Sequence, residues 1–454
     1  MMSLCWGLLA AAAQAQTITL EFPAFAGKTF EWVLFQGDKT IKLYENDTIP
    51  ANGKMVLEVP QQYAPYSGMC RWLITNTAEG GGLDMAIPGQ SFSVKCLSAK
   101  PNNDNIVFEG YDALHELNRL HALQQGIIEK YDAMSKATQL YDAKHPLFAT
   151  LQKEKEAQVL AYTQFQQDLK KNPNYNAQIL PIFNLVSGTP PQLTDDYNER
   201  AKLVNQYITH ELNFDHLYTS GHWTGIIQSW VQMHAQLYQD KDGFVKAFNV
   251  VSNRISEPAK YTDFVGKVTY MLNKLGKDDF VEGIAPTVVN SGKITAYEGA
   301  TMQVYVKALT GSKAPDIVLP NGKVWKSNEW ATDKAEQTLV VFFASDCGHC
   351  EELLKTLQAQ YKTLQDKHIR IIALAADTDE ALFNKAKAAF PWQDTYCDLK
   401  GMSGVNFKAF AVSGTPTMVL VNKQGIITLR TSHLEEVLNV GGGLSETKNQ
   451  FTNN

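Results

Sequence analysis

The feature of this sequence that most limits its fold is an apolar run that ends almost directly in two closely spaced cysteines. Residues Thr338–Ala344 are β-branched, aromatic or aliphatic throughout, as expected of a strand buried on both faces. After two polar residues, Cys347–Cys350 (Cys-Gly-His-Cys) opens a segment with helical periodicity that continues to Gln365. A cysteine at a helix N-terminus lies beside unpaired amides that stabilise a thiolate. The second cysteine, one turn along the same helix, can then form a disulfide with the first.

The residues after this pair predict a compact α/β unit. We expect strands at Ile369–Ala375, Thr417–Val421 and Ile426–Leu429, and helices at Glu380–Phe390 and from about His433. The order strand–helix–strand–helix–strand–strand–helix, with Cys-x-x-Cys at the first strand-to-helix junction, is the layout of the thioredoxin fold.

Three motifs make this region similar to a known family. They are Ala314–Asp316 with Asn321-Gly322, the Cys347–Cys350 motif, and Gly414–Thr417 (Gly-Thr-Pro-Thr). On these motifs the region from Lys313 resembles the exported thioredoxins of the TlpA/ResA type. The arrangement of the whole chain resembles thioredoxin-like envelope proteins of Bacteroidota.

The resemblance implies a role for each matching residue. Cys347 would attack a substrate disulfide and Cys350 would resolve the mixed disulfide. A cis bond between Thr415 and Pro416 would bring the Thr415 backbone beside Cys347, where an extended substrate could pair with it.

The neighbours of the two cysteines are expected to tune them. Gly348 lets a substrate backbone approach, and His349 can stabilise the Cys347 thiolate, which makes the pair more oxidising. Asp346 stands where the family usually has tryptophan, and its charge opposes thiolate formation. Val341 occupies the position of the buried acid of thioredoxin, so Asp377 and Glu380 are the candidates for the proton acceptor of Cys350.

The N-terminal part, residues 16–110, reads as a β-sandwich-like module. Short alternating runs separated by turn signals predict its strands: Phe30–Phe35, Thr40–Tyr44, Met55–Val59, Met69–Ile74 and Ser91–Leu97. By the same alternation, Cys70 and Cys96 both point into the core. A structural disulfide between them and two separate buried thiols are both compatible with the sequence.

The middle of the chain is predicted to be all-helical over residues 111–289, without an internal repeat. Helical periodicity covers residues near 114–128, 146–172, 196–219, 225–238 and 258–275. Residues 290–312 read as a linker with brief strand character at Met302–Val306. The thioredoxin-like domain then covers residues 313–442, and 443–454 form a tail. The chain is therefore expected to be multidomain, with β, all-α and α/β parts in that order.

The first 15 residues predict a signal peptide. Leu4–Ala13 is almost entirely apolar, and Ala13-Gln14-Ala15 fits a small-x-small cleavage site. We therefore expect an exported protein of the periplasm or cell envelope. Five cysteines remain after cleavage, and an odd number leaves at least one unpaired. Cys397 is then a free buried thiol, or else a regulatory or resolving cysteine.

Several other classes of function receive no support. A net charge of −6 without a basic stripe argues against nucleic-acid binding. No second Cys/His pair accompanies Cys347 and Cys350 at zinc-site spacing, and His210, His216 and Asp240–Gly243 do not form metal-binding patterns. No metal or other cofactor is expected.

Three functional hypotheses follow. The first is a thiol–disulfide oxidoreductase that acts on disulfide-bearing envelope proteins and receives electrons from a thiol donor, expected to be membrane-bound. The family resemblance favours a reductase, whereas Gly348-His349 favours an oxidase or isomerase. The second is a thiol peroxidase, although Val340 and Ala344 replace the proline and threonine upstream of a peroxidatic cysteine. The third is an envelope binding or scaffold protein with an accessory redox domain.

Overall fold

The computed structural model describes residues 15–78, 81–112, 115–296, 302, 304–305 and 309–440. The predicted tail at 443–454, and the predicted signal peptide except for its last residue, lie outside them. The chain divides into two compact units, Met1–Ile226 and Ile227–Asn454. The sequence grouped all central helices in one region, but the structure shares them between these two units.

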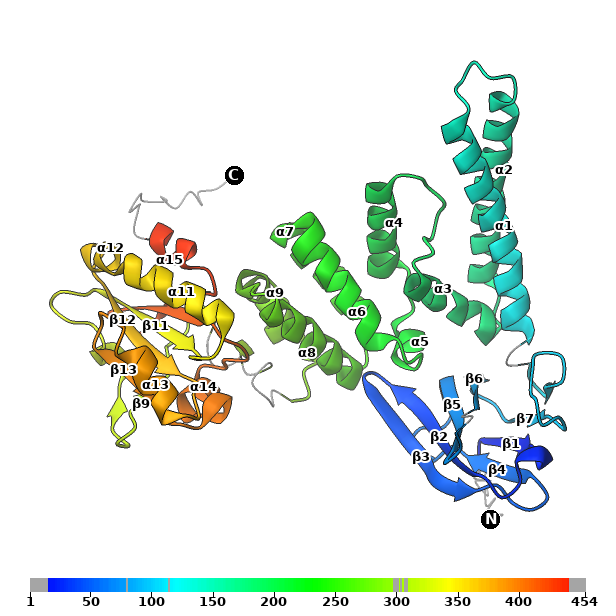
Figure 1. The fold of residues 1–454 in the computed structure, drawn as a ribbon, viewed down its shortest axis with the longest axis horizontal. Coiled ribbons are helices and arrows are strands. Elements are labelled where there is room, and N and C mark those ends of the chain that lie inside the picture. The colour runs from blue at the N-terminus through cyan, green and yellow to red at the C-terminus, as the bar shows by residue number, and fades with distance from the viewer. Residues whose placement is uncertain are drawn as a thin grey trace, which may run out of the picture. The chain divides into compact units, whose positions relative to one another are not determined.

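The first unit begins with two four-stranded sheets, ordered β4-β1-β7-β8 and β3-β2-β5-β6 (Figure 1). Their strands are β1 (Thr17–Glu21), β2 (Thr29–Gln36), β3 (Lys39–Thr48), β4 (Lys54–Glu58), β5 (Ser67–Thr75), β6 (Gly82–Pro88), β7 (Phe92–Lys95) and β8 (Val107–Glu109). One side of each sheet contributes to a shared core that includes Ile18, Trp32, Leu57 and Trp72. The predicted sandwich-like module is therefore present.

Alternation between buried and less buried residues is strict in three of the strands. Residues of β1, β4 and β7 alternate strictly between buried and less buried positions, as in half-buried strands. The predicted runs did not include β1, β6 or β8: β8 is only three residues long, and β6 lacks such an alternation.

Cys70 and Cys96 both belong to the sandwich core, and both are free thiols. Burial raises the pKa of Cys70 to about 12. The Cys96 thiol lies 3.3 Å from the side-chain oxygen of Asn105. Of the two alternatives that the sequence left open, the structure therefore has the separate buried thiols.

The helices of the first unit follow β8. They are α1 (His115–Leu140), α2 (Phe148–Lys171), α3 (Tyr175–Ser187), α4 (Tyr197–His210), α5 (Phe214–Tyr218) and α6 (Trp223–Gln232), which crosses the division between the units. Helix α3 was not predicted, because its sequence is apolar around most of its circumference and contains Pro181. Asn174 caps it by accepting a hydrogen bond from the Asn176 amide.

The end of α5 explains why helices and sandwich form one unit. The Thr219 hydroxyl donates to the Ser67 carbonyl at 2.7 Å, and the Met69 amide donates to the Thr219 carbonyl at 2.8 Å. The Gly37 amide similarly donates to the Tyr218 carbonyl at 2.7 Å. These bonds join the end of α5 to the end of β2 and the start of β5.

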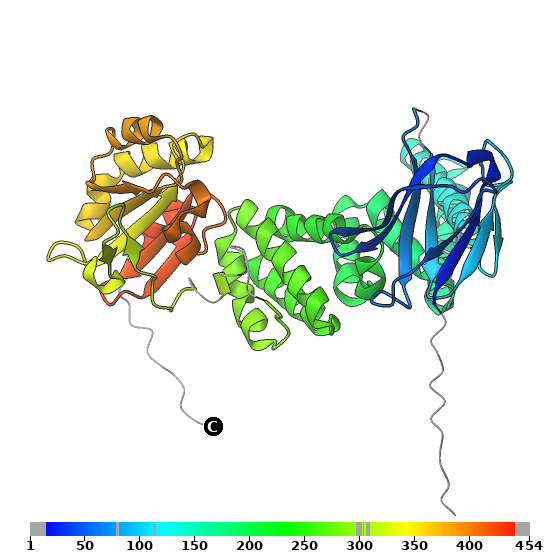
Figure 2. The ribbon, with the colours of Figure 1, turned by 90° about the horizontal axis from the view of Figure 1, so that it is seen from below.

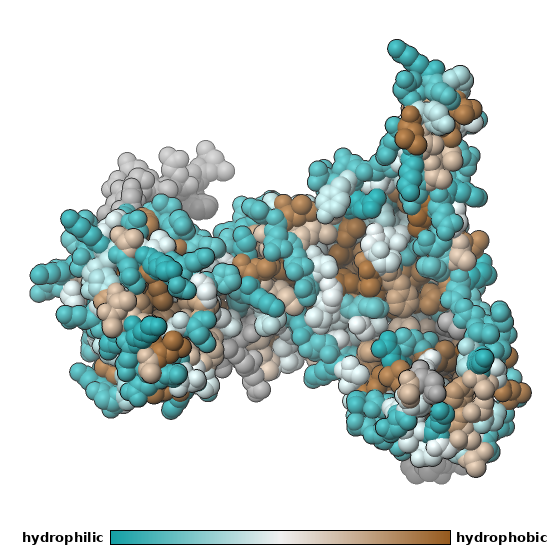
Figure 3. Space-filling view, viewed as in Figure 1, coloured by the Kyte–Doolittle hydropathy of each residue, from teal (hydrophilic) through white to brown (hydrophobic). Residues whose placement is uncertain are grey.

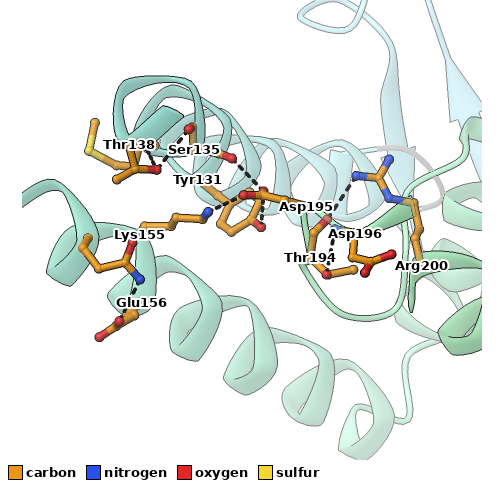
Figure 4. A network of polar contacts seen from close by, with 11 residues as sticks. Tyr131, Ser135, Thr138, Lys155, Glu156, Thr194, Asp195, Asp196 and Arg200 are labelled. Atoms are coloured by element: carbon orange, nitrogen blue, oxygen red, sulfur yellow. Dashed lines mark hydrogen bonds and ion pairs between the residues drawn. The ribbon is translucent and has the colours of Figure 1, made fainter. Parts of the chain in front are cut away.

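Helices α1 and α2 form a long hairpin held by a polar network (Figure 4). The Asp195 carboxylate accepts hydrogen bonds from the hydroxyls of Tyr131 and Ser135, each at 2.6 Å, and pairs with Lys155. Burial on its own raises the pKa of Asp195, but the bonds from Lys155, Ser135 and Tyr131 outweigh it and hold the pKa below its usual range. Asp195 thus fastens the segment before α4 to both helices of the hairpin.

The free end of this hairpin exposes apolar side chains among hydrophilic ones (Figure 3). Leu140 is 82% exposed and Leu147 is 52% exposed. None of the helices that the structure describes has both the length and the apolar character required to span a membrane.

The second unit contains the remaining helices and the C-terminal α/β domain. Its central helices are α7 (Lys241–Arg254), α8 (Pro258–Lys274) and α9 (Asp278–Asn290), preceded by a π-helical segment at Met233–Tyr238. Asp240 caps α7 by accepting a hydrogen bond from the Gly243 amide, so Asp240–Gly243 lies at a junction between helices. Helices α7 and α9 were not predicted.

The α/β domain has a five-stranded sheet in the order β13-β12-β11-β14-β15 (Figures 1 and 2). Its elements are β9 (Ile317–Val318), β10 (Val324–Trp325), β11 (Gln337–Phe343), α11 (Gly348–Ala359), α12 (Tyr361–Asp366), β12 (Ile369–Ala375), α13 (Glu380–Lys387), β13 (Asp394–Cys397), α14 (Val405–Ala409), β14 (Thr417–Asn422), β15 (Ile427–Thr431) and α15 (Leu434–Val440). Strand β11 lies at the centre, parallel to β12 and antiparallel to β14. The predicted α/β thioredoxin-like fold is confirmed.

Alternate residues of β11 face two separate cores. Leu339 and Val341 lie in one core with α11, α12, α13 and α15. Val340 and Phe342 lie in the other with Phe407 of α14 and with Trp330. Burial on both faces accounts for the uninterrupted apolar run in the sequence.

The structure corrects the predicted layout at two places. Met302–Val306 was predicted as a strand, but Met302, Val304 and Tyr305 are helical and buried. The Tyr305 hydroxyl is 2.5 Å from the Thr269 hydroxyl of α8, so the expected linker contains residues that belong to the helical core. Strand β13 and helix α14 are additional to the predicted order, because they have only four and five residues, too few to show a period.

The Asp195 network leads to a prediction for stability. Replacing Asp195 with Ala should lower the free energy of unfolding of the first unit by about 1–2 kcal/mol, since three donors lose a charged but partly exposed acceptor. Because the pKa of Asp195 is depressed in the folded state, this contribution is present above about pH 4 and is lost as the pH falls through the folded pKa.

Urea denaturation near neutral pH and at about pH 2–3, below the ordinary pKa of an aspartate, measures both effects. Asp132, which is exposed on α1, provides the matched control, and Asp132→Ala should leave the unfolding free energy unchanged. Equal losses in the two variants, or a loss at Asp195 that persists unchanged in acid, would contradict this role of the network.

Candidate redox site

The sheet and the following helix together place Cys347 at a helix N-terminus. Strand β11 ends at Phe343, and Cys347 is the N-cap of α11 with extended backbone angles, φ −95° and ψ 118°. Its carbonyl accepts the first helical hydrogen bond, from the Glu351 amide at 2.9 Å. The Cys347 side chain therefore lies where the amides of the first turn have no helical partner.

The proline loop reaches the same place through the pairing of β14 with β11. Thr417 pairs with Phe342, so the residues just before β14 lie beside the residues just after β11. The Thr415–Pro416 peptide bond is cis, as the resemblance implied. The Cys347 sulfur lies 3.7 Å from the Thr415 carbonyl oxygen and donates to it, across 68 residues of sequence.

The two cysteines differ in exposure. Cys347 is partly exposed, whereas Cys350 is fully buried at 0% exposure in the core beneath α11. Both are free thiols in this structure. An incoming disulfide can therefore reach Cys347, while Cys350 can be reached only from Cys347.

The pKa values of the two thiols are shifted in opposite directions. Burial raises the pKa of Cys347, but bonds from the Cys350 thiol, from the backbone amides of Cys350 and His349, and from Thr415 outweigh it and lower that pKa overall. Burial raises the pKa of Cys350 to about 11. Because of this difference, the Cys347 thiol ionises at a lower pH than the Cys350 thiol.

The neighbouring residues lie on the exposed side of the pair. Asp346, Gly348 and His349 are exposed, and a Cβ at Gly348 would meet no atom within 4 Å. Space above Gly348 is therefore open to a substrate backbone. The bond that His349 gives to the Cys347 sulfur comes from its backbone amide, whereas the sequence suggested its imidazole.

The turn before Cys347 is held by a contact that the sequence did not predict. Asp377, which is 4% exposed, follows β12. Its two carboxylate oxygens accept bonds from the Ser345 amide at 2.8 Å and the Ser345 hydroxyl at 2.5 Å. These contacts make Asp377 a positioning residue for the turn. Glu380, the other candidate proton acceptor, is exposed at the start of α13.

Cys397 lies at the end of β13, beside the last residue of β12. Its thiol donates to the Asp377 carbonyl at 3.3 Å, and burial raises its pKa. The Cys397 side chain lines a small cavity with Val318, Tyr396 and Phe407. These surroundings are those of a partly buried thiol whose reactivity is suppressed.

Comparison with known proteins supports the assignment of this domain. A sequence model of the AhpC/TSA family matches residues 310–430. No curated protein is similar enough to the chain to match it.

Several solved structures with similar domains come from Bacteroides species. The thioredoxin domain of a thiol-disulfide oxidoreductase from Bacteroides vulgatus is 24% identical, with 29% of this chain and 94% of that chain covered and a TM-score of 0.25. A thiol-disulfide oxidoreductase from Bacteroides fragilis is 22% identical, with 28% and 99% covered and a TM-score of 0.23. A thioredoxin-like protein from Bacteroides caccae is 17% identical, with 54% and 92% covered and a TM-score of 0.36.

The C-terminal part of the chain is therefore a thioredoxin-like domain with an AhpC/TSA family match. The sheet order, the cysteine pair at the N-terminus of α11 and the adjacent proline loop are the structural basis for this statement.

The pKa shift of Cys347 predicts how its reactivity changes with pH. In the reduced chain, alkylation of Cys347 by iodoacetamide should reach half its maximal rate below about pH 8.5, the value for a free cysteine. Cys350→Ala removes one bond to the Cys347 sulfur and should move this midpoint upward.

Thiolate absorbance in the ultraviolet gives a second measure of the same midpoint. Cys397→Ser, which changes a thiol outside the pair, is the control and should leave the midpoint unchanged. A midpoint at or above that of free cysteine in the unsubstituted chain would contradict the proposed stabilisation of the thiolate.

Proposed function

We propose that this protein is a thiol–disulfide oxidoreductase that acts on protein disulfides, working as a reductase. The observation that carries the proposal is the position of the Cys347 sulfur at the N-terminus of α11, 3.7 Å from the Thr415 carbonyl and one turn from buried Cys350. This arrangement provides a nucleophile, an internal resolving thiol and a backbone edge for a substrate.

The reaction proceeds in two exchange steps. The Cys347 thiolate attacks one sulfur of the substrate disulfide, forms a mixed disulfide and releases the other sulfur as a thiolate. Cys350 then loses its proton and attacks the Cys347 sulfur, which forms the Cys347–Cys350 disulfide and releases the second substrate thiol. Two electrons pass from the pair to the substrate, and an external thiol donor must return them to the pair.

The surroundings of Cys347 support each step. The lowered pKa of Cys347 increases the thiolate fraction available for attack, and the raised pKa of Cys350 delays its own ionisation. The open space above Gly348 and the adjacent Thr415 backbone suit an extended substrate segment. We propose that Thr415 and Pro416 dock such a segment.

The location and partners belong to the same proposal. The predicted signal peptide supports export to the periplasm or cell envelope, where disulfide-bearing proteins occur. Substrates would then be envelope proteins with disulfides, and the electron donor would be a thiol protein, expected to be membrane-bound.

One observation favours a second function, disulfide oxidation or isomerisation. A stabilised Cys347 thiolate favours the reduced pair and so makes the disulfide form a stronger oxidant. The direction of electron flow depends on how large this stabilisation is.

The two other hypotheses, a thiol peroxidase and a binding or scaffold protein, can be tested by experiment. Val340 and Ala344 stand where a peroxidatic site would have proline and threonine, so we expect no rapid peroxide consumption. A binding or scaffold role for the sandwich and helices is compatible with an active redox domain.

Trapping experiments test the proposal directly. Cys350→Ser should accumulate a mixed disulfide between Cys347 and a protein substrate such as insulin, because the resolving thiol is gone. Cys347→Ser should form none and should lose nearly all insulin reduction driven by dithiothreitol.

Non-reducing gels followed by mass spectrometry identify the linked cysteine. Cys397→Ser serves as the control and should retain insulin reduction. Equal trapping by Cys350→Ser and Cys347→Ser variants, or trapping through Cys397, would exclude Cys347 as the nucleophile.

A further inference from the structure

The segment that leads into the proline loop is held by polar contacts that depend on helices outside the thioredoxin-like domain. Helices α8 and α9 belong to the same compact unit as this domain. In the first contact, the Asn273 side chain near the end of α8 donates to the Ser413 hydroxyl at 2.8 Å. Ser413 lies two residues before Thr415, whose carbonyl meets the Cys347 sulfur.

A second contact involves a buried charge. Arg430 of β15 is 4% exposed and donates to the carbonyls of Phe410 at 2.9 Å and Ala411 at 3.1 Å. Ala411 has a φ of 50°, which is unusual for a residue with a side chain, so this backbone conformation needs support from outside the loop. Arg430 supplies that support.

The charge of Arg430 is balanced from α9. Asp278, at the first position of α9 and 8% exposed, lies 3.7 Å from the Arg430 guanidinium, and Glu282 one turn later also interacts with it. A buried guanidinium without a carboxylate partner is strongly unfavourable. The position of Arg430, and with it the Phe410–Ala411 backbone, therefore depends on α9.

A third contact is a hydrogen bond between the α8–α9 turn and the thioredoxin-like domain. The Ser432 hydroxyl donates to the Gly276 carbonyl at 3.1 Å. Gly276 has a φ of 65°, and a Cβ there would lie 2.7 Å from the Ser432 hydroxyl oxygen. Only glycine fits this turn, which lies against the loop between β15 and α15.

We propose that the end of α8 and the α8–α9 turn together form a positioning element of the redox site, in which Asn273 fixes the substrate-docking loop through Ser413. This inference rests on the proposed oxidoreductase function, and it assigns a role to part of the helical region. The turn does not touch either cysteine, so it acts on substrate docking and leaves the chemistry of the Cys347–Cys350 pair unchanged.

The test uses the full chain and three variants: Asn273→Ala, Ser413→Ala and the double variant. The probes are insulin, a protein disulfide that must dock, and dithiobis(nitrobenzoate), a small disulfide that does not need a backbone edge. Each single variant should raise KM for insulin by roughly two- to tenfold, the effect of one hydrogen bond, with little change in kcat. The rate with dithiobis(nitrobenzoate) should remain within about twofold of the unsubstituted chain.

The double variant shows whether the Asn273–Ser413 hydrogen bond causes the rise in KM for insulin. If a single bond between Asn273 and Ser413 carries the effect, the double variant should have the same KM as either single variant. Lys274→Ala, at the exposed neighbouring position on α8, is the control and should keep the original KM.

The outcomes separate this inference from the proposed function. An unchanged KM in both single variants, additive effects in the double variant, or equal losses with both probes would overturn the positioning role while leaving the oxidoreductase function intact. A lack of turnover of both probes by the unsubstituted chain would overturn the proposed function, and this inference with it.

Discussion

The site depends above all on the antiparallel pairing of β14 with the central strand β11. This pairing sets Thr417 opposite Phe342 and so brings the proline loop to the start of α11. Cys347 and Thr415 meet there although 68 residues separate them in the sequence. Since β11 is hydrogen-bonded on both sides and buried on both faces, its end is a rigid place from which to present a thiol.

A helix N-terminus at a partly exposed position then gives the two thiols different properties. Cys347 receives hydrogen bonds from amides while it stays partly exposed to solvent, and its pKa is lowered. Cys350 is buried, and its hydrogen bonds do not outweigh the effect of burial, which raises its pKa. Polar contacts fix the segments on either side of the pair: Asp377 holds the turn before Cys347, and Arg430 holds the residues that lead to Thr415. The partly exposed Cys347 sulfur thus lies between segments that are held in place by polar contacts.

The sequence was sufficient to predict the fold of the C-terminal domain and the position of Cys347 and Cys350 at the start of a helix, because a buried strand, a cysteine motif and a proline motif are local patterns. It missed α3, whose apolar sequence has no clear amphipathic period, and it missed β13 and α14, which are too short to show one. The contacts of Asp377 with Ser345 and of Asp278 with Arg430 could not be predicted, since they join residues whose proximity exists only after folding. The strand prediction at Met302–Val306 was wrong because five mostly apolar residues are compatible with a buried helix as well.

The most direct test of the central claim, that Cys347 and Cys350 form a redox-active pair, is the equilibrium reduction potential of their disulfide in glutathione or dithiothreitol buffers. The account predicts a value in the range from roughly −270 mV, typical of thioredoxin and of a reductase, to roughly −180 mV, typical of disulfide isomerases. Its position within that range also decides between the reductase and the oxidising alternative. A value below about −300 mV, typical of structural disulfides, would contradict the account.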